Sequence, residues 1–173
     1  MKKLICFLLL LTIPIVVYSE EIIRETKFKF GVVERIYYSG GKEIASQKIV
    51  NGDVVEARGK VPDGIIKEYY PNGKVQFEDN YKNGTQNGLS RRHYETGQLM
   101  VESEYIDGKM NGISKGYYEN GQLKSVVNFK NNLQDGQTKG YSNNGDLQLE
   151  ANFKNGKKDG IFKSYGGGGW LQA

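Results

Sequence analysis

Glycine recurs at a fixed interval of 24 residues through most of this chain, and this feature constrains the fold more than any other. Three columns keep the interval without a single insertion. They are Gly64, Gly88, Gly112, Gly136 and Gly160; Gly73, Gly97, Gly121, Gly145 and Gly169; and Gly84, Gly108 and Gly156, with Asn132 in the missing place. Self-similarity at a period of about 20 to 50 residues is the signature of repeat architecture. We therefore predict that residues 64–173 form an array of regular repeats, the last one truncated.

Each repeat is predicted to be a β-hairpin. In the first regular unit, residues 65–70 are a β-branched and aromatic run, Pro71-Asn72-Gly73 is a turn, and residues 74–82 are a second run that ends at Asn83-Gly84. Asn-Gly and Asp-Gly pairs adopt positive φ at low cost and suit tight turns between antiparallel strands. The density of such pairs excludes helices. We predict an all-β fold, an elongated single-layer antiparallel sheet of stacked hairpins.

The second strand of each unit alternates between apolar and polar residues. Such alternation indicates one buried and one solvated face. We expect two columns to share the buried face: Val75, Leu99, Leu123 and Leu147 near the turn, and Tyr81, Tyr105, Phe129 and Phe153 at the far end. The acidic residues Glu78, Glu102 and Glu150 are expected on the opposite face.

Three columns of the first strand share one face. They are Ile65, Leu89, Ile113, Gln137 and Ile161; Lys67, Arg91, Lys115, Lys139 and Lys163; and Tyr69, His93, Tyr117, Tyr141 and Tyr165. Equivalent positions of successive repeats lie side by side, so each column becomes a ladder. Because one unit has too little apolar surface to fold alone, stacking should bury a continuous stripe.

The basic and aromatic ladders are the candidate binding residues. The basic ladder could present a row of cations to anionic lipid or glycan headgroups, or its members could be solvated or paired with the acidic column. The ladder of Tyr69, Tyr117, Tyr141 and Tyr165 could stack on sugar rings, or it could form the core stripe. His93 is expected to be an aromatic-sized substitute in that ladder.

The segment before the regular repeats is less regular. Residues 20–30 are predicted to form a strand that caps the array, and residues 31–63 a degenerate first repeat, because Tyr37-Tyr38 precede Gly41 as Tyr69-Tyr70 precede Gly73. Residues 53–62 are eight residues longer than their counterparts. We expect a lengthened connection there, with Val54, Val55 and Val61 partly buried.

The N-terminus is typical of a secretory signal peptide. Lys2 and Lys3 precede an apolar run over residues 4–17, and Val17-Tyr18-Ser19 suits a cleavage site. An uncleaved anchor is the alternative, but the run is shorter than the roughly 20 residues that span a bilayer. We predict a signal peptide over residues 1–19, and hence a periplasmic, cell-surface or secreted protein. The only cysteine, Cys6, lies within it, so no disulfide is expected.

Charge and motifs exclude several classes of function. The net charge of +4 would fall to +2 without Lys2 and Lys3, which gives no support for nucleic acid as a partner. Enzymatic motifs such as Gly-x-Ser-x-Gly and His-Glu-x-x-His are absent, and Gly166 to Gly169 are not followed by the Lys-Ser of a phosphate loop. We predict no catalytic residue, no cofactor and no metal site.

The repeated pattern resembles a known family. Units of the form Gly-Ile-x-Lys-x-Tyr-Tyr-x-Asn-Gly-x-Leu, followed by an aromatic residue and Lys-Asn-Gly, resemble MORN repeats over about residues 31–171. They are most similar to the bacterial variant form found in antitoxin-like proteins. The resemblance implies an elongated sheet of hairpins, used as a scaffold for protein or membrane contacts, with no shared catalytic residues.

These observations predict a non-catalytic binding scaffold, exported from a bacterial cell, that contacts a protein partner or an envelope surface. Two alternatives stay open: a toxin-antitoxin-like component that neutralises or carries a partner, and a binder of anionic lipid headgroups. The last hairpin stops at Ala173 with its second strand incomplete. An open strand edge can pair with another strand, so self-association through the C-terminal edge is also expected.

Overall fold

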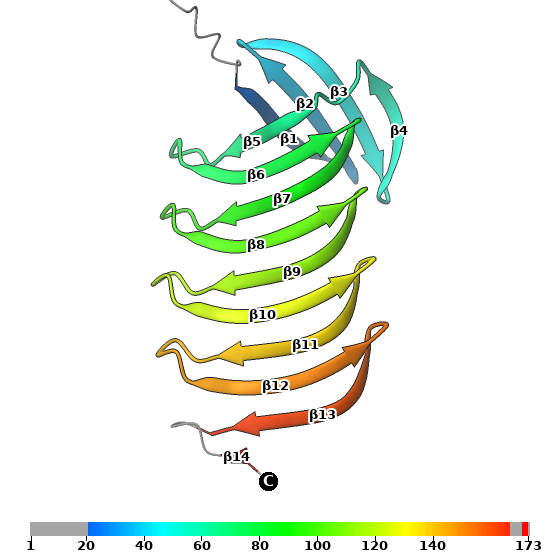
Figure 1. Cartoon of the computed structure of the whole chain (residues 1–173). Helices are drawn as coiled ribbons and strands as arrows, with labels where there is room; N and C mark the ends of the chain where they lie inside the picture. Colours follow the sequence, from blue (N-terminus) through cyan, green and yellow to red (C-terminus); the bar gives the residue numbers. More distant parts are fainter. Residues whose placement is uncertain (1–20, 167–170, 173) are drawn as a thin grey trace, which may run out of the picture.

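The computed structural model describes residues 21–166 and 171–172, which form one sheet of 14 strands and contain no helix (Figure 1). The N-terminal strands are β1 (Ile22–Lys29), β2 (Val32–Ser39), β3 (Lys42–Val50) and β4 (Asp53–Arg58). The regular repeats contain β5 (Gly64–Tyr69), β6 (Val75–Lys82), β7 (Thr85–His93), β8 (Leu99–Ile106), β9 (Lys109–Tyr117), β10 (Leu123–Lys130), β11 (Leu133–Tyr141), β12 (Leu147–Lys154), β13 (Lys157–Tyr165) and β14 (Leu171–Gln172). The predicted all-β array of hairpins is confirmed.

The predicted signal peptide, residues 1–19, lies outside the described residues. Since the described ranges contain no helix, none of their segments is a helix able to cross a bilayer. At the other end of the chain, β14 pairs with β13 through Ser164 and Tyr165, while Gly169 lies outside the described part. Self-association through this edge stays a prediction.

The order of strands changes at the N-terminal end of the sheet. From β5 to β14 each strand pairs with the next one along the chain, but the sheet then continues β5-β1-β2-β3-β4. Strand β1 therefore lies between β5 and β2, and it runs parallel to β5 through the pairs Ile22 with Ile66 and Ile23 with Lys67. The segment predicted to cap the array is an interior strand, and β4 forms the edge.

The residues predicted as a lengthened connection, 53–62, mostly form the edge strand β4, and residues 59–63 then lead the chain to β5 beside β1. Gly59 passes close to the backbone of β3, where a Cβ would meet the carbonyl oxygen of Ile44. Val61 then enters the only cluster of buried hydrophobic residues in the described chain, with Tyr37, Ala45 and Ile66. Val54 and Val55 are 52% and 61% exposed, so their predicted burial is wrong, because β4 is an edge strand.

Two-residue turns join each repeat to the next along one edge of the sheet, here called the turn edge. Asn83 and Gly84 have φ values of 54° and 76°, as a type I′ turn requires. Asn132 occupies a glycine position of these turns with a φ of 69°. Asn tolerates this left-handed conformation, which explains the one exception in the glycine column.

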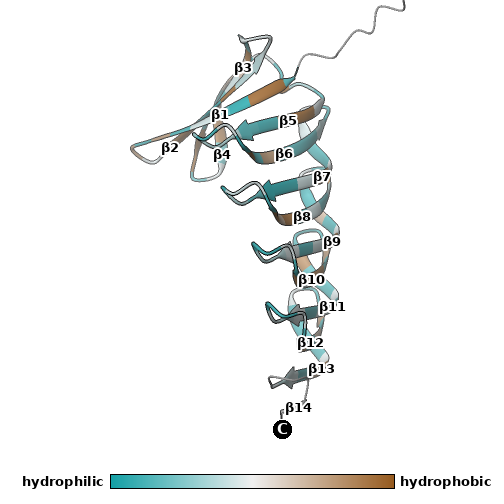
Figure 2. Cartoon of the chain, turned by 90° about the vertical axis from the view of Figure 1, so that its left-hand side faces the viewer, coloured by the Kyte–Doolittle hydropathy of each residue, from teal (hydrophilic) through white to brown (hydrophobic). Residues whose placement is uncertain are grey.

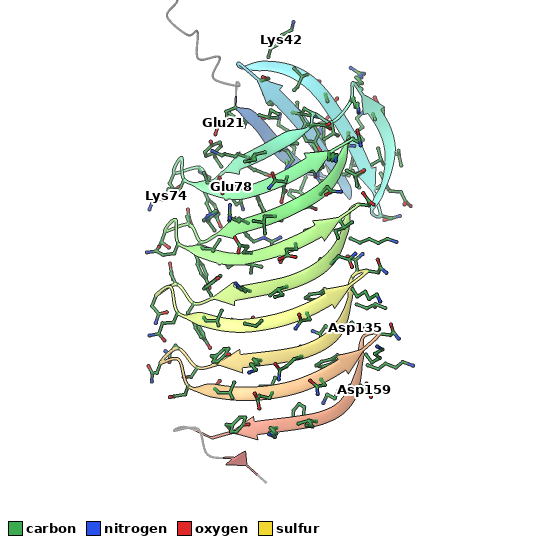
Figure 3. All side chains as sticks on the ribbon, viewed as in Figure 1. Glu21, Lys42, Lys74, Glu78, Asp135 and Asp159 are labelled. Atoms are coloured by element: carbon green, nitrogen blue, oxygen red, sulfur yellow. The ribbon has the colours of Figure 1, made fainter. Side chains whose placement is uncertain are left out.

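The opposite edge, here called the loop edge, carries longer loops that are tied together by tyrosine. Gly73 donates a backbone hydrogen bond to the Tyr70 carbonyl at 2.9 Å and closes the first regular loop. The Tyr70 hydroxyl donates to the carbonyl of His93 in the following repeat at 2.7 Å, and Tyr94 and Tyr118 donate equivalent bonds. Figure 3 shows Lys74 at the loop edge and Asp135 and Asp159 at the turn edge.

A β-bulge near each loop reverses the alternation of side chains. In the first regular hairpin Glu68 pairs with Phe77, but Tyr69 pairs with Val75, so Gln76 is an extra residue. Because directly opposed residues point to the same face, Val75 lies with Tyr69. The same irregularity occurs at Met100, Lys124 and Gln148. The column of Val75 therefore does not share a face with that of Tyr81, and this prediction is wrong.

We call the face that carries Tyr69 and Val75 the outer face, and the face that carries Asp79 and Tyr81 the inner face. A second irregularity lies near the turn edge. Asn80 faces three residues of β7, among them Gly88 at a φ of 109°, and its amide donates to the Leu89 carbonyl at 2.7 Å. Such bulges bend a strand, and Figure 1 shows β7, β9, β11 and β13 strongly curved.

The glycine at the second irregularity should be essential for folding. In Gly136, φ is 113° and a Cβ would lie 3.2 Å from Cβ of Asn128. We expect Gly136→Ala to lower the free energy of unfolding by about 1 to 3 kcal/mol, because an L side chain is strained there. Urea unfolding followed by circular dichroism measures the change. Gly140→Ala on the same strand has room for its methyl group and should change stability by less than about 0.5 kcal/mol. Equal losses in both variants would contradict this account.

The buried Tyr37 should make the fold sensitive to alkali. Burial raises its pKa to about 12, so the neutral phenol is favoured in the folded state. The stability that this provides is complete below about pH 10 and is lost as the pH rises toward 12, a change of about 3 kcal/mol. Tyr37→Phe, which has no ionisable hydroxyl, should lose less stability over that interval in urea titrations at fixed pH. Parallel pH profiles for the two proteins would exclude this role of Tyr37.

Candidate functional site

The predicted basic ladder lies on the outer face and is largely paired with the acidic column. The sheet register places Glu78 opposite both Lys67 and Arg91, and Glu102 opposite both Arg91 and Lys115. The ion pairs are Lys67 with Glu21 at 2.8 Å and Glu78 at 3.8 Å, Arg91 with Glu102 at 2.7 Å, and Glu150 with Lys139 at 3.4 Å and Lys163 at 4.0 Å. Most of the positive charge of this ladder is therefore neutralised.

Lys115 is the exception within this ladder. Its neighbours across the sheet are Glu102 and Val126, and Val126 occupies the position that is acidic in the other repeats. Among the residues that the structure describes, Lys115 forms no ion pair and is exposed. A single cation on an otherwise neutralised face offers little attraction for a polyanionic surface.

The tyrosines of the predicted aromatic ladder also lie on the outer face, where they are half-buried. Tyr117 and Tyr141 lie opposite Leu123 and Leu147, and so form an apolar stripe near the loop edge. The end members contact carboxylates: Tyr69 donates to Glu21 at 2.7 Å and Tyr165 to Glu150 at 2.9 Å.

These contacts lower the pKa of the two carboxyl groups that they involve. Hydrogen bonds from Lys67 and then Tyr69 lower the pKa of Glu21, against the effect of burial. The hydrogen bond from Tyr165 and the contacts with Lys139 lower the pKa of Glu150. These carboxyl groups of the outer face are therefore held by contacts within the face itself.

The inner face contains a groove of about 490 Å³ that the sequence did not reveal. One wall comes from β1 and β2, and the other from β6, β7 and β8. Figure 2 shows the β1–β2 hairpin projecting sideways from the column of repeats. The lining residues used below are Arg24, Phe28, Arg35, Glu68, Phe77, Asp79, Arg92 and Tyr105.

Arg24 is buried at the base of the groove and joins β1 to β5 and β6. Its guanidinium donates from Nε to Glu68 and from Nη1 to Asp79, both at 3.0 Å, and its exposed fraction is 7%. Burial alone would lower the pKa of Arg24, but the charges of Asp79, Tyr81 and Glu68 together raise it. The side chain is therefore a permanent cation that fixes both carboxylates.

Further hydrogen bonds complete this network. The Ser90 hydroxyl donates to Asp79 at 2.7 Å, the Gln86 amide donates to the same oxygen at 3.0 Å, and Thr26 donates to Glu68 at 3.1 Å. Every carboxylate of the groove is thus held by donors from other strands. The base of the groove is preorganised before any ligand binds.

Two arginines of the groove have no acidic partner. The exposed Arg92 lies over the ring of Phe77, with its guanidinium carbon 4.8 Å from the ring centroid. Arg35 lies across the groove on β2. Neither forms an ion pair within the described residues. Planar guanidinium groups beside aromatic rings are suited to binding carboxylates.

Sequence reasoning missed the groove because its walls are far apart in the chain. One signal was available, since Glu68 and Asp79 interrupt columns that carry no carboxylate in later repeats. The equivalents of Asp79 are Ser103, Val127 and Ala151. The partner of these carboxylates, Arg24, could not be inferred, because the pairing of β1 with β5 is not apparent from the sequence. In the described ranges no group of three or more potential ligands could hold a metal ion.

Comparison with known proteins identifies the regular hairpins. The family model described as MORN repeat variant matches residues 62–83, 86–107, 110–131 and 134–155, just over half of the chain. Each matched segment corresponds to one hairpin, from β5–β6 to β11–β12. No curated protein matches the sequence. The strands β1 to β4 lie outside the matched segments. One wall of the groove, from β1 and β2, is therefore outside the family match, and the other wall, from β6 to β8, is inside it.

Arg24 should contribute strongly to stability. Arg24→Met leaves Glu68 and Asp79 close together without their cation, and we expect the free energy of unfolding to fall by about 3 kcal/mol. Chemical unfolding at neutral pH measures the loss. The matched control is Lys48→Met, which removes the exposed pair with Glu56 at 2.7 Å and should cost less than about 1 kcal/mol. A loss for Arg24→Met no greater than that of the control would show that the network is not structural.

Proposed function

The chain belongs to the MORN-repeat family, and we propose that it is an exported, non-catalytic scaffold that binds a protein partner through the inner-face groove. MORN repeats generally form scaffolds with a binding role, and members of the family are generally not enzymes. Export is supported by the basic and apolar sequence of residues 1–19.

The observation that carries the proposal is the contrast between the two faces. On the outer face, four of the five ladder cations form ion pairs. In the groove, Arg35 and Arg92 retain their charge without an acidic partner, beside Phe77 and Tyr105. Arginine and aromatic side chains are the residues that contribute most at protein interfaces.

A non-catalytic role is supported by the state of the groove carboxylates. Glu68 and Asp79 are the acidic residues that line it, and both are ion-paired with Arg24. Both carboxylates already accept hydrogen bonds from donors of the protein itself, so neither is placed to exchange a proton with a ligand. The chemistry of the groove is therefore that of binding.

The alternative of an anionic lipid ligand would depend on the outer ladder. Only Lys115 of that ladder lacks an ion pair among the described residues, so the structure favours the groove. Neutralisation or carriage of a toxin-like partner would use the same kind of protein contact.

Charge reversal on the two faces tests the proposal. We expect the double variant Arg35→Glu/Arg92→Glu to lose at least about 90% of the proteins that wild-type protein cross-links in an envelope extract, because repulsion replaces attraction. Quantitative mass spectrometry measures this loss. The matched control is Lys115→Glu/Lys139→Glu on the outer face, which should retain the same proteins.

Both variants must first show wild-type circular dichroism. A partner set that is unchanged by the groove variant would refute the proposal. Loss of partners only in the outer-face variant, together with loss of sedimentation with anionic liposomes, would favour the lipid alternative.

A further inference from the structure

We propose that the tip of the β1–β2 hairpin is an aromatic anchor for the ligand, and that this ligand is an extended acidic polypeptide segment with apolar side chains. The proposal rests on the proposed function, because it identifies the kind of partner that the same groove would bind. It is carried by a strained and exposed phenylalanine, by the shape of the inner-face hollow, and by its charge.

Phe30 has an unusual conformation for its residue type. It is in the two-residue turn between β1 and β2 with a φ of 49°. The equivalent positions of the other two-residue turns are Gly40, Asn51, Asn83, Asp107, Asn131 and Asn155. Asn and Asp tolerate this left-handed region, whereas a bulky aromatic residue does not adopt it without strain. Local backbone preference therefore does not explain the phenylalanine.

Packing does not explain it either. Phe30 is 95% exposed, and its ring is accompanied only by the Lys29 ammonium, 5.9 Å from its centroid. Phe28, on the same hairpin, is 78% exposed and lines the groove. Two exposed aromatic rings at a projecting tip are unfavourable for the isolated protein. Strain of this kind is found at functional positions, and aromatic side chains are common anchors at interfaces.

The shape of the hollow indicates an extended ligand. A second hollow of about 220 Å³ shares Ser90, Arg92 and Tyr105 with the groove and continues it over β8 and β9. Its floor includes Ser103 and Ser114, whose hydroxyl oxygens lie 2.7 Å apart in a hydrogen bond. Together the two hollows run along the stack from Phe28 of the hairpin to Ser114 of β9. A segment of extended polypeptide follows such a path better than a compact ligand does.

The charge of the path indicates acidic residues on the ligand. Arg35 and Arg92 form no ion pair, and Lys29 at the tip forms none within the described chain. Glu68 and Asp79 are both ion-paired with Arg24, and the three arginines and two carboxylates that line the groove leave it one net positive charge. Carboxylates placed between apolar side chains would pair with the free cations while the apolar groups contact Phe28 and Phe30.

Fluorescein-labelled synthetic peptides of 12 residues provide the probes. One alternates Glu and Leu, the second replaces Glu by Lys, and the third replaces Leu by Ser. Fluorescence anisotropy with the full chain at low salt should show that the first peptide binds at least about tenfold more tightly than either control. Its affinity should fall as the salt concentration rises, because ion pairs are screened.

Two variants test the anchor. Phe30→Asn should raise the urea midpoint of unfolding, since it relieves backbone strain, and weaken binding of the first peptide by at least about fivefold. Phe162→Asn replaces another exposed aromatic, 53% exposed and on β13 outside the groove, and should leave the affinity unchanged. A stabilised Phe30→Asn protein with wild-type affinity would overturn the anchor, and equal binding of all three peptides would overturn the ligand class.

The two proposals can fail separately. If Arg35→Glu/Arg92→Glu loses its cellular partners but the three peptides bind equally, the groove is a binding site and the acidic, apolar ligand is wrong. If the first peptide binds selectively but is unaffected by Arg35→Glu/Arg92→Glu, its site lies elsewhere and the anchor is refuted, while the cellular partners of the same variant decide the groove.

Discussion

Backbone pairing between successive hairpins is the interaction on which this structure depends. The described chain has one small hydrophobic cluster around Tyr37 and Ile66, and nearly all residues of the regular repeats are half-buried or exposed. A hairpin with so little apolar surface is not stable alone. Each repeat is therefore stabilised by its neighbours, through strand ladders and through hydrogen bonds such as that from Tyr70 to the next repeat.

The position of β1 converts this uniform stack into a molecule with a distinct site. Because β1 lies between β5 and β2, Arg24 reaches two carboxylates that belong to the first regular hairpin. The same placement brings Phe28 and Arg35 to the hollow that β6 to β8 line from the other side. The N-terminal strands therefore do more than cover the end of the stack. Arg24 of β1 ties them to the first regular hairpin, and β1 and β2 form one wall of the groove.

The two faces of the sheet have different physical characters. On the outer face, opposite charges alternate across the strands and compensate one another, with Val126 as the single interruption. On the inner face, carboxylates are fixed at the base while Arg35 and Arg92 form no ion pair with any residue that the structure describes. Exposed ion pairs add little stability and attract a ligand only weakly. Cations without an ion pair, held in a preorganised groove, can instead form their ion pairs with a partner.

The 24-residue glycine period by itself determined that the chain is an all-β array of hairpins, because turns such as Asn83-Gly84 depend on local backbone preference. It also determined that Ile65, Lys67 and Tyr69 share a face, since β5 contains no bulge. Only the tertiary structure decided where Val75 points, because the extra residue Gln76 becomes evident only when the strands are paired. It alone decided the site as well: a strand pairing between segments about 40 residues apart leaves no periodic trace, so Arg24 and the groove could not be read from the repeat.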